Sequence, residues 1–311
     1  MNRCFTALAA LSLALAASAT LGAQTSAPAP SMAMPNRASA MPAPPNILLI
    51  ETDNIKAYNT TPYDKVAEQY VAVAKKYNLP GSAIAMEAMS GATREQFLFA
   101  YDSFQDMQNQ NDAMMKNAAV TEAFAHLDSL EAQYTTEVHQ TIWHYRDDLS
   151  NNAAAADIPH CVYWETIVFH IKPGHDSQFE GLIKTVQATY AKIGANISWA
   201  TFESEMGATD TYNIIVPMKS LKDEDDALAR DKSFAAALGA DGQHQMDQVA
   251  SESYLSVEDT LWMVNPKTSY VPKEMIAANP DFWAPKPAAP TGKSTTAMPA
   301  MKPKAKTAPA Q

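Results

Sequence analysis

Residues 87–93 read Glu-Ala-Met-Ser-Gly-Ala-Thr, and residues 203–209 read Glu-Ser-Glu-Met-Gly-Ala-Thr, so that the two Gly-Ala-Thr motifs lie 116 positions apart. Two further matches follow the same order, Tyr63 with Phe179 and, after small gaps, residues 138–143 with residues 257–262. Short matches of this kind arise easily by chance, but matches that keep one order along the chain do not. We therefore expect an internal duplication.

Each matching copy has the pattern of a strand, a helix, two strands, a helix and a last strand. In the second copy, residues 165–172 are rich in branched and aromatic side chains and end at Pro173-Gly174, as a strand does when it meets a turn. Apolar residues then recur at the spacing of one helical face. Further elements are expected at 83–89, 97–101 and 107–132, and at 197–205, 212–216 and 222–250, the last broken at Gly239 and Gly242.

Such a copy forms a four-stranded antiparallel sheet that has helices on one face only. Along the strand that ends at residue 172, Trp164, Thr166, Val168 and His170 alternate onto one side, while branched and aromatic side chains occupy the other. Both faces are therefore partly apolar, and the uncovered face needs a partner. We expect an α+β fold in which two tandem ferredoxin-like (βαββαβ) repeats form a pseudo-dimeric α/β barrel around a small central space.

Composition divides the chain into a folded centre and two tails of low complexity. Residues 1–23 have a basic start, a short apolar run and small residues at the end, which is the pattern of a secretory signal peptide. We expect disorder on both sides of the centre, where branched and aromatic residues are scarce. The expected divisions are a signal peptide at 1–23, an Ala/Pro/Met linker at 24–45, repeat 1 at 46–150, a linker at 151–159, repeat 2 at 160–270, a C-terminal extension at 271–283 and a Pro/Ala/Lys tail at 284–311.

Charge and cysteine content limit the classes of partner. The net charge is −11, with no basic stripe in the central part, which argues against nucleic acid and anionic lipid. The basic tail is a candidate for contact with a cell-envelope polymer. Cleavage of the signal peptide removes Cys4 and leaves Cys161 as the one cysteine, so that no internal disulfide is expected. We expect a secreted or periplasmic protein that has no membrane span and in which repeat 1 packs on repeat 2.

Three short motifs carry a resemblance to a known superfamily. They are Lys172-Pro173-Gly174-His175, Trp199-Ala200-Thr201-Phe202-Glu203, and Val216-Pro217 before Lys219-Ser220-Leu221. Together they resemble the dimeric α/β-barrel superfamily, which includes antibiotic-biosynthesis-monooxygenase-like (ABM-like) proteins, over residues 46–270. Within it the chain is most similar to secreted tandem-repeat proteins of Acidobacteria-type bacteria that have no assigned activity. The resemblance implies the barrel fold. Its members include cofactor-free monooxygenases and haem proteins, so it implies no single chemistry.

The candidate site residues follow from the expected barrel interior. A neutral imidazole beside aromatic walls is suited to act as a general base, which selects His170, and Glu203 is the matching carboxylate candidate. The same chemistry fits a hydrogen-bonded interior histidine with no catalytic role. Residues expected to contact a ligand are Trp164, Thr166, Val168, Trp199, Thr201, His139, Trp143 and Trp262.

Metal and cofactor motifs are largely absent from the sequence. There is no zinc spacing, EF-hand loop, phosphate-binding loop or Gly-x-Ser-x-Gly elbow, so we predict no metal site and no cofactor. Haem is kept as an alternative, because the resemblance implies a proximal ligand near His244 on a late helix.

Three functions remain open at this point. The first is binding of a small apolar or aromatic molecule inside the barrel. The second is a cofactor-independent monooxygenase-like oxidoreductase that uses His170 and Glu203. The third is a non-catalytic envelope-associated protein whose barrel is packed solid and whose tail attaches it to the envelope. The sequence does not decide whether the chain is an enzyme.

Overall fold

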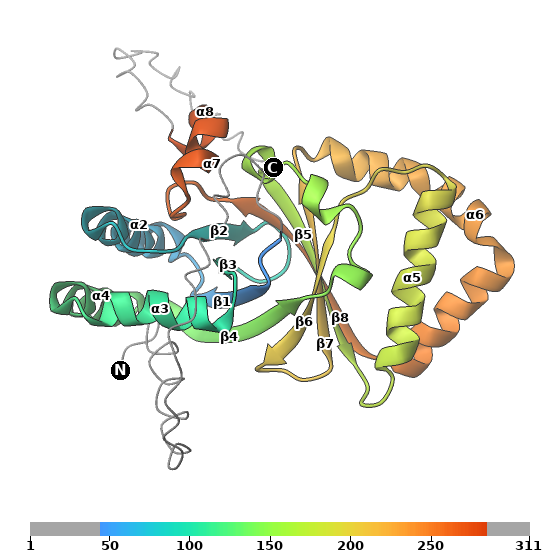
Figure 1. Cartoon of the computed structure of the whole chain (residues 1–311), viewed down its shortest axis with the longest axis horizontal. Coiled ribbons are helices and arrows are strands. Elements are labelled where there is room, and N and C mark those ends of the chain that lie inside the picture. Colours follow the sequence, from blue (N-terminus) through green and yellow to red (C-terminus); the bar gives the residue numbers. More distant parts are fainter. Residues whose placement is uncertain (1–43, 285–311) are drawn as a thin grey trace, which may run out of the picture.

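Eight antiparallel strands close into one barrel within residues 44–284, the part of the chain that the computed structural model describes. Around the barrel the strand order is β1-β3-β2-β8-β5-β7-β6-β4 (Figure 1). The strands are β1 (Ile47–Ile55), β2 (Ala83–Ala88), β3 (Arg94–Tyr101), β4 (Thr135–Tyr145), β5 (Tyr163–Ile171), β6 (Ala200–Met206), β7 (Thr211–Met218) and β8 (Tyr254–Val264). The α+β class and the closed barrel predicted from the sequence are confirmed.

Both halves of the barrel follow one strand order. The first half runs β4-β1-β3-β2 and the second runs β8-β5-β7-β6, which is the same order of last, first, third and second strand. The halves join at two seams, where β2 pairs with β8 and β4 pairs with β6. Each half thus has its last strand beside the second strand of the other half.

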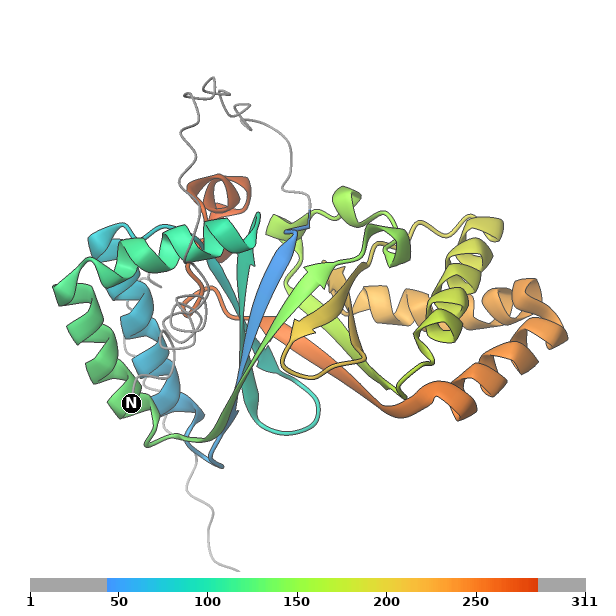
Figure 2. The same ribbon diagram turned by 60° about the horizontal axis from the view of Figure 1, so that its bottom comes forward.

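The described residues form seven α-helices outside the barrel: α2, α3 and α4 cover the first half, α5 and α6 cover the second half, and α7 and α8 lie at one end (Figure 2). The expected helix at 107–132 is two helices, because Asn117 interrupts it and its side chain accepts a hydrogen bond from the Val120 amide at the start of the second. The expected break at Gly239 is present as a kink with φ 77°. The helices are α2 (Thr60–Tyr77), α3 (Phe104–Met115), α4 (Ala118–Glu131), α5 (Asp176–Lys192), α6 (Lys222–Ser253), α7 (Lys273–Ala278) and α8 (Pro280–Trp283).

Strand alternation separates an inner core from two outer cores. In β1, Leu48 and Ile50 join a cluster that contains residues of both halves, whereas Ile47 and Leu49 pack with the helices of the first half. The second half has its own helix-facing cluster, which includes Phe179. Each fully buried apolar side chain contributes about 1.5–3 kcal/mol to the stability of the folded state. Since the inner cluster contains residues of both halves, its burial stabilises the contact between them.

The last described segment closes one end of the barrel. Met275 of α7 and Trp283 of α8 belong to the inner cluster. The indole Nε1–H of Trp283 donates to the Pro159 carbonyl at 2.9 Å, and Asn279 Nδ2 donates to the same oxygen at 3.1 Å. The predicted signal peptide, nearly all of the 24–45 linker, and the basic tail from residue 285 lie outside the described residues. Within residues 44–284 no helix combines the length and hydropathy of a bilayer span.

Candidate functional site

A cavity of about 320 Å³ lies in the barrel interior, at the end covered by α7. Interior-facing apolar side chains from both halves form most of its wall, and Pro272 and Met275 also line it. The wall includes Leu48, Ile84 and Leu98 of the first half and Trp164, Phe202 and Ile215 of the second half. This volume is at the lower end of the range of 300–1,000 Å³ that is usual for small-molecule sites. We call it the barrel-end cavity.

Five of the predicted ligand residues face the barrel interior. Trp143, Trp164 and Trp262 belong to the inner cluster, and Val168 packs against it. Trp262 donates its Nε1–H to Thr166 Oγ1 at 2.8 Å, and both side chains are buried. Of these five, Trp164 lines the barrel-end cavity. The others fill the interior beyond it, as core residues rather than as a ligand platform.

The two histidines do not lie at the cavity. His170 is six residues beyond Trp164 on β5, which is about 20 Å along an extended strand. There its Nδ1 lies 3.2 Å from Thr211 Oγ1. His139 of β4 is largely exposed and lies 3.2 Å from the Glu137 carboxylate. Both positions are at the far end of the barrel, so the geometry places no imidazole beside a molecule in the barrel-end cavity.

The expected interior orientation of Trp199, Thr201 and Glu203 is wrong. Ala200 and Phe202 take the interior positions of this segment, so their odd-numbered neighbours face the helix layer. Trp199 Nε1 and Thr201 Oγ1 both donate to the Leu149 carbonyl, at 2.9 and 2.8 Å. Trp199 touches the cavity but packs with the outer cluster of the second half.

Glu203 is part of an ion-pair network rather than an interior acid. Arg146 Nη1 lies 2.5 Å from Glu203 Oε2 and 2.8 Å from Glu180 Oε1. The Asp148 carboxylate, together with Glu180 and Glu203, raises the pKa of the Arg146 guanidinium, which stays charged. Glu203 is thus neutralised by a fixed cation outside the barrel. It has no access to the barrel-end cavity.

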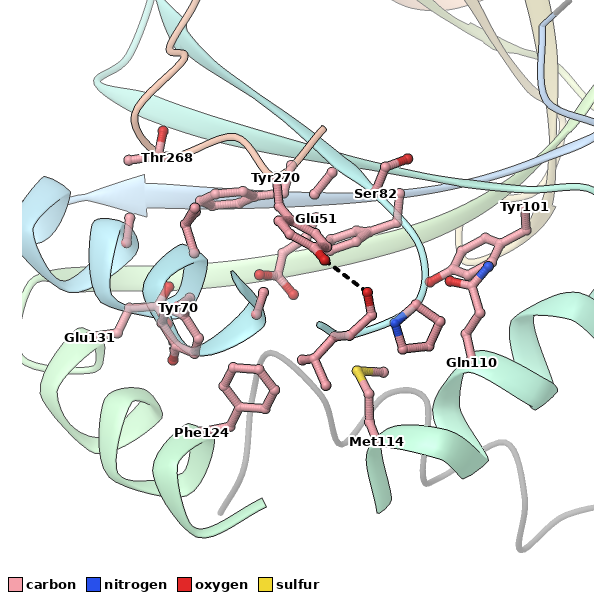
Figure 3. A pocket seen from close by; sticks show the side chains of 18 of the residues that line it. Glu51, Tyr70, Ser82, Tyr101, Gln110, Met114, Phe124, Glu131, Thr268 and Tyr270 are labelled. Carbon is pink, nitrogen blue, oxygen red and sulfur yellow. Dashed lines mark hydrogen bonds between the residues drawn. The ribbon is translucent and has the colours of Figure 1, made fainter. Parts of the chain in front are cut away.

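A second pocket lies between the sheet and the helices of the first half, and the sequence analysis did not find it (Figure 3). Its volume is about 100 Å³. Four tyrosines line it, Tyr63, Tyr70, Tyr101 and Tyr270, and Tyr270 donates its hydroxyl hydrogen to the Leu79 carbonyl at 2.9 Å. Phenylalanines 97, 99 and 124 complete the aromatic wall, and Glu51 and Glu131 bring carboxylates to it. We call it the aromatic pocket.

Five carboxylic acids are buried at and beneath the aromatic pocket, and the fifth, Asp128, lies beside Tyr70. Glu51, Asp53, Glu95 and Glu131 are each 5% exposed or less. One oxygen from each of Glu51, Asp53 and Glu131 lies within 4.8 Å of the others. Two full negative charges at that separation would repel by roughly 3 kcal/mol at an effective dielectric constant of about 20. A proton on one of these carboxyl groups removes that repulsion.

Hydrogen bonds hold these acids in place. Tyr63 donates its hydroxyl hydrogen to Asp53 Oδ2 at 2.6 Å, while Asp53 Oδ1 is buried with no hydrogen-bond partner among the described residues. Gln140 Nε2 donates to Glu51, and the Tyr70 hydroxyl lies within hydrogen-bond distance of two acids, 2.7 Å from Asp128 Oδ1 and 2.9 Å from Glu131 Oε2. Burial, and then the nearby Glu131 carboxyl, raises the pKa of Asp53 well above its ordinary value.

Glu95 extends the same acidic region on the neighbouring strand. It pairs in register with Asp53, and the hydroxyl of Thr268 donates to its Oε1 at 2.7 Å. Its Oε2 is buried without a hydrogen-bond partner among the described residues. Burial raises the pKa of the Glu95 carboxyl well above its ordinary value, although the Thr268 bond opposes this shift.

The second half has a larger space of about 550 Å³ at the corresponding place, between its sheet and α5 and α6. Glu165 lines it, and burial together with the neighbouring Asp259 carboxylate raises the pKa of Glu165 to about 7. Within the described residues, no histidine lines this space or the two pockets above. His244 is exposed on α6. The residues around these cavities therefore offer no imidazole for haem, and we derive no step through it.

Comparison with known proteins gives only distant structural likenesses. Neither a protein-family model nor a curated protein sequence matches the chain. A candidate monooxygenase from Fusobacterium nucleatum has 16% identity and a TM-score of 0.47, over 72% of this chain and 94% of that one. An anthrone oxidase-like protein has 10% identity and a TM-score of 0.49, over 70% and 91%. A chlorite dismutase from Candidatus Nitrospira defluvii has 7% identity and a TM-score of 0.42, over 72% and 92%.

These likenesses are to barrel proteins of diverse activity. With TM-scores below 0.5, they carry no conclusion about what this chain binds or catalyses. None of them bears on the expected relation to secreted proteins of Acidobacteria-type bacteria, which stays a prediction. What this chain does has to be inferred from its own residues.

Proposed function

We propose that this protein binds one small, uncharged apolar or aromatic molecule in the barrel-end cavity. The observation that carries the proposal is the cavity of about 320 Å³, walled by apolar side chains from both halves of the barrel. Its size fits a molecule of up to three rings, and the indole of Trp164 offers an aromatic contact. A barrel packed solid, as the structural alternative requires, would have no such space.

The chemistry of the wall favours binding over catalysis. The titratable side chains that line the barrel-end cavity are Tyr101, Asp102 and Asp106. Burial raises the pKa of the Tyr101 hydroxyl, so this group stays neutral. His170 and Glu203, on which the monooxygenase-like alternative depends, lie elsewhere. The proposed ligand is therefore held mainly by shape and apolar contact, and no imidazole lies at the cavity to act as the general base of that alternative.

Two features of the sequence, an internal repeat and the pattern of an export signal, add to the proposal. The equal strand order of the two halves and the matching Gly-Ala-Thr motifs support a tandem duplication of one ferredoxin-like unit. The pattern of residues 1–23 supports export, which would give the protein access to small molecules outside the cytoplasm.

The test is titration of the purified protein with N-phenyl-1-naphthylamine, an uncharged aromatic dye whose emission rises in apolar surroundings. We expect saturable binding of one dye per chain. Ala200 lines the barrel-end cavity, so Ala200→Leu should fill part of it and weaken binding at least tenfold. The matched control is Ala236→Leu on the exposed surface of α6, which should bind as the parent does. Dye binding that does not saturate, or that Ala200→Leu leaves unchanged, would refute the proposal.

A further inference from the structure

We propose that the space between the sheet and the helices of the second half binds an amphiphilic anion, a flexible hydrocarbon chain that ends in a carboxylate. This space of about 550 Å³, which we call the second-half cavity, lies on the helix-facing side of the sheet, whereas the barrel-end cavity lies inside the barrel. The inference does not depend on the function proposed above.

The helices of the second half leave apolar surface uncovered. In the first half, α4 packs Val120, Phe124 and Leu127 into the core. At the corresponding place in the second half, α6 has 32 residues, of which Ser253 alone is buried (Figure 1). Seven apolar side chains around the core of this half are only partly buried, and all seven line the second-half cavity. An apolar ligand that covers them is stabilised by removing this surface from water.

The cavity has the length that a hydrocarbon chain requires. Its floor runs along β5 from Glu165 to Phe169 and along the neighbouring β7 from Ile214 to Met218, a separation of four residues in each strand. Four residues of extended strand cover about 13 Å. The volume is within the range of 300–1,000 Å³ that is usual for small-molecule sites. This long apolar floor favours a flexible chain over a compact ring system.

Arg230 of α6 supplies the cation for the carboxylate. Its side chain lines the cavity, and its Nε is buried without a hydrogen-bond partner among the described residues. Phe234, one turn further along α6, packs its ring on Tyr190 with centres 4.8 Å apart, which holds this part of the helix beside the cavity. The ion pairs found within residues 44–284 do not include Arg230.

Most acids that line the cavity already have a partner within the chain. The pairs are Asp226 with Lys222, Asp157 with Lys219, Asp223 with the Ser220 backbone amide, and Glu165 with Asp259. The remaining acid is Glu224, which forms no ion pair with Arg230. Burial, ahead of the neighbouring Asp259 and Asp223, raises the pKa of the Glu224 carboxyl, which makes it a weaker counter-ion.

A carboxylate matches the unpaired guanidinium in geometry as well as in charge. The two groups form parallel, charge-assisted hydrogen bonds that are roughly twice as strong as bonds between neutral groups. With its head at Arg230, the ligand places its chain along the apolar floor. An alcohol of the same length keeps the apolar contact and loses the charge.

The experiment is calorimetric titration of the whole protein at pH 7 with decanoate, and separately with decan-1-ol, which has the same chain without the charge. We expect saturable binding of one decanoate per chain and at least tenfold weaker binding of the alcohol. Arg230→Gln should weaken decanoate binding at least tenfold and remove the preference over the alcohol. The matched control is Lys232→Gln on the exposed surface of α6, which should bind decanoate as the parent does.

A second pair of variants tests the place of the chain. Ala227 lines the second-half cavity, so Ala227→Phe should fill part of it and weaken decanoate binding at least tenfold. Its control is Ala229→Phe, because Ala229 is exposed on the same helix. Arg230 makes no ion pair, so Arg230→Gln should fold as the parent does, and melting curves of all four variants check this.

Four outcomes would overturn the inference. One is equal binding of decanoate and decan-1-ol, which would mean that the charge is not recognised. Another is tighter binding of decyltrimethylammonium than of decanoate, which would mean that the acids of α6 outweigh Arg230. The third is decanoate binding that neither Arg230→Gln nor Ala227→Phe weakens, which would place the ligand elsewhere, for example in the barrel-end cavity. The fourth is the absence of saturable decanoate binding up to 10 mM.

Discussion

The buried pair of Asp53 and Tyr63 gives the sharpest test of how the first half is built. Tyr63 is 1% exposed and donates to Asp53, which is fully buried, at 2.6 Å. Tyr63→Phe removes the hydroxyl that donates to the Asp53 carboxyl. We expect this substitution to lower the free energy of unfolding by about 1–3 kcal/mol. In an Asp53→Leu background the hydroxyl already lacks its acceptor. There the same change at Tyr63 should be neutral or stabilising.

The measurement is a double-mutant cycle by equilibrium urea unfolding, followed by tryptophan fluorescence and circular dichroism. The coupling energy should be close to the cost of Tyr63→Phe alone, about 1–3 kcal/mol. Tyr58→Phe serves as the control, because Tyr58 is fully exposed and its change should stay within about 0.5 kcal/mol. If Tyr63→Phe costs the same in both backgrounds, the hydrogen bond does not stabilise the fold and the reasoning fails.

The free energies of unfolding in this cycle should depend on pH, and the raised pKa of Asp53 determines the direction of the change. Burial raises the pKa of Asp53 above its unfolded value, so the group's contribution to stability is present below the unfolded pKa and is lost as pH rises through the folded pKa. The groups that face Asp53 are Tyr63 of α2, Glu131 of α4 and the acids on its own and the adjacent strand, Glu51 and Glu95. Asp53→Leu should therefore be more favourable at pH 8 than at pH 5, relative to the parent.

Three further predictions concern the rest of the barrel. Burial raises the pKa of Glu165 to about 7, so stability should fall as pH rises from about 4.5 to 7, and Glu165→Gln should flatten that fall in urea titrations at each pH. Thr166→Val leaves the buried Trp262 Nε1–H without its acceptor and should cost about 1–3 kcal/mol in the same assay. Trp283→Ala removes a buried indole and its bond to the Pro159 carbonyl, and should cost about 3–5 kcal/mol, measured by urea unfolding, and loosen dye binding in the barrel-end cavity.

Alternation along one strand was enough to predict the inner face of β5. Trp164, Thr166 and Val168 face the interior as expected, because each half offers only one uncovered sheet face and the two faces cover each other. The same rule failed at Trp199 and Glu203. The segment before and within β6 has large side chains on both faces, so the sequence pattern there does not distinguish interior from helix layer.

The aromatic pocket was missed for a different physical reason. β1 reads Ile-Leu-Leu-Ile-Glu-Thr-Asp-Asn-Ile, so Glu51 and Asp53 look like the solvent side of a half-buried strand. Which face of β1 the helices cover is decided by residues far along the chain, including Glu131 on α4 and Thr268 after β8. One signal was present in the sequence, since at the shift of 116 positions Asp53 aligns with Phe169, and a matched pair of acid and phenylalanine suggests a buried position.

The two halves differ in the side chains that face the helices from their first strands. Both halves use the same strand order, and the second satisfies the helix-facing side of its first strand with Ile167 and Phe169. Replacing such residues by carboxylic acids lowers stability unless protons, donors or a cation compensate. The second half also has an acid on this face, Glu165, whose pKa burial raises to about 7, so buried carboxyl groups occur in both halves and are more numerous in the first. Protons and the Tyr63 hydroxyl compensate the acids of the first half, which makes the stability of this half depend on pH.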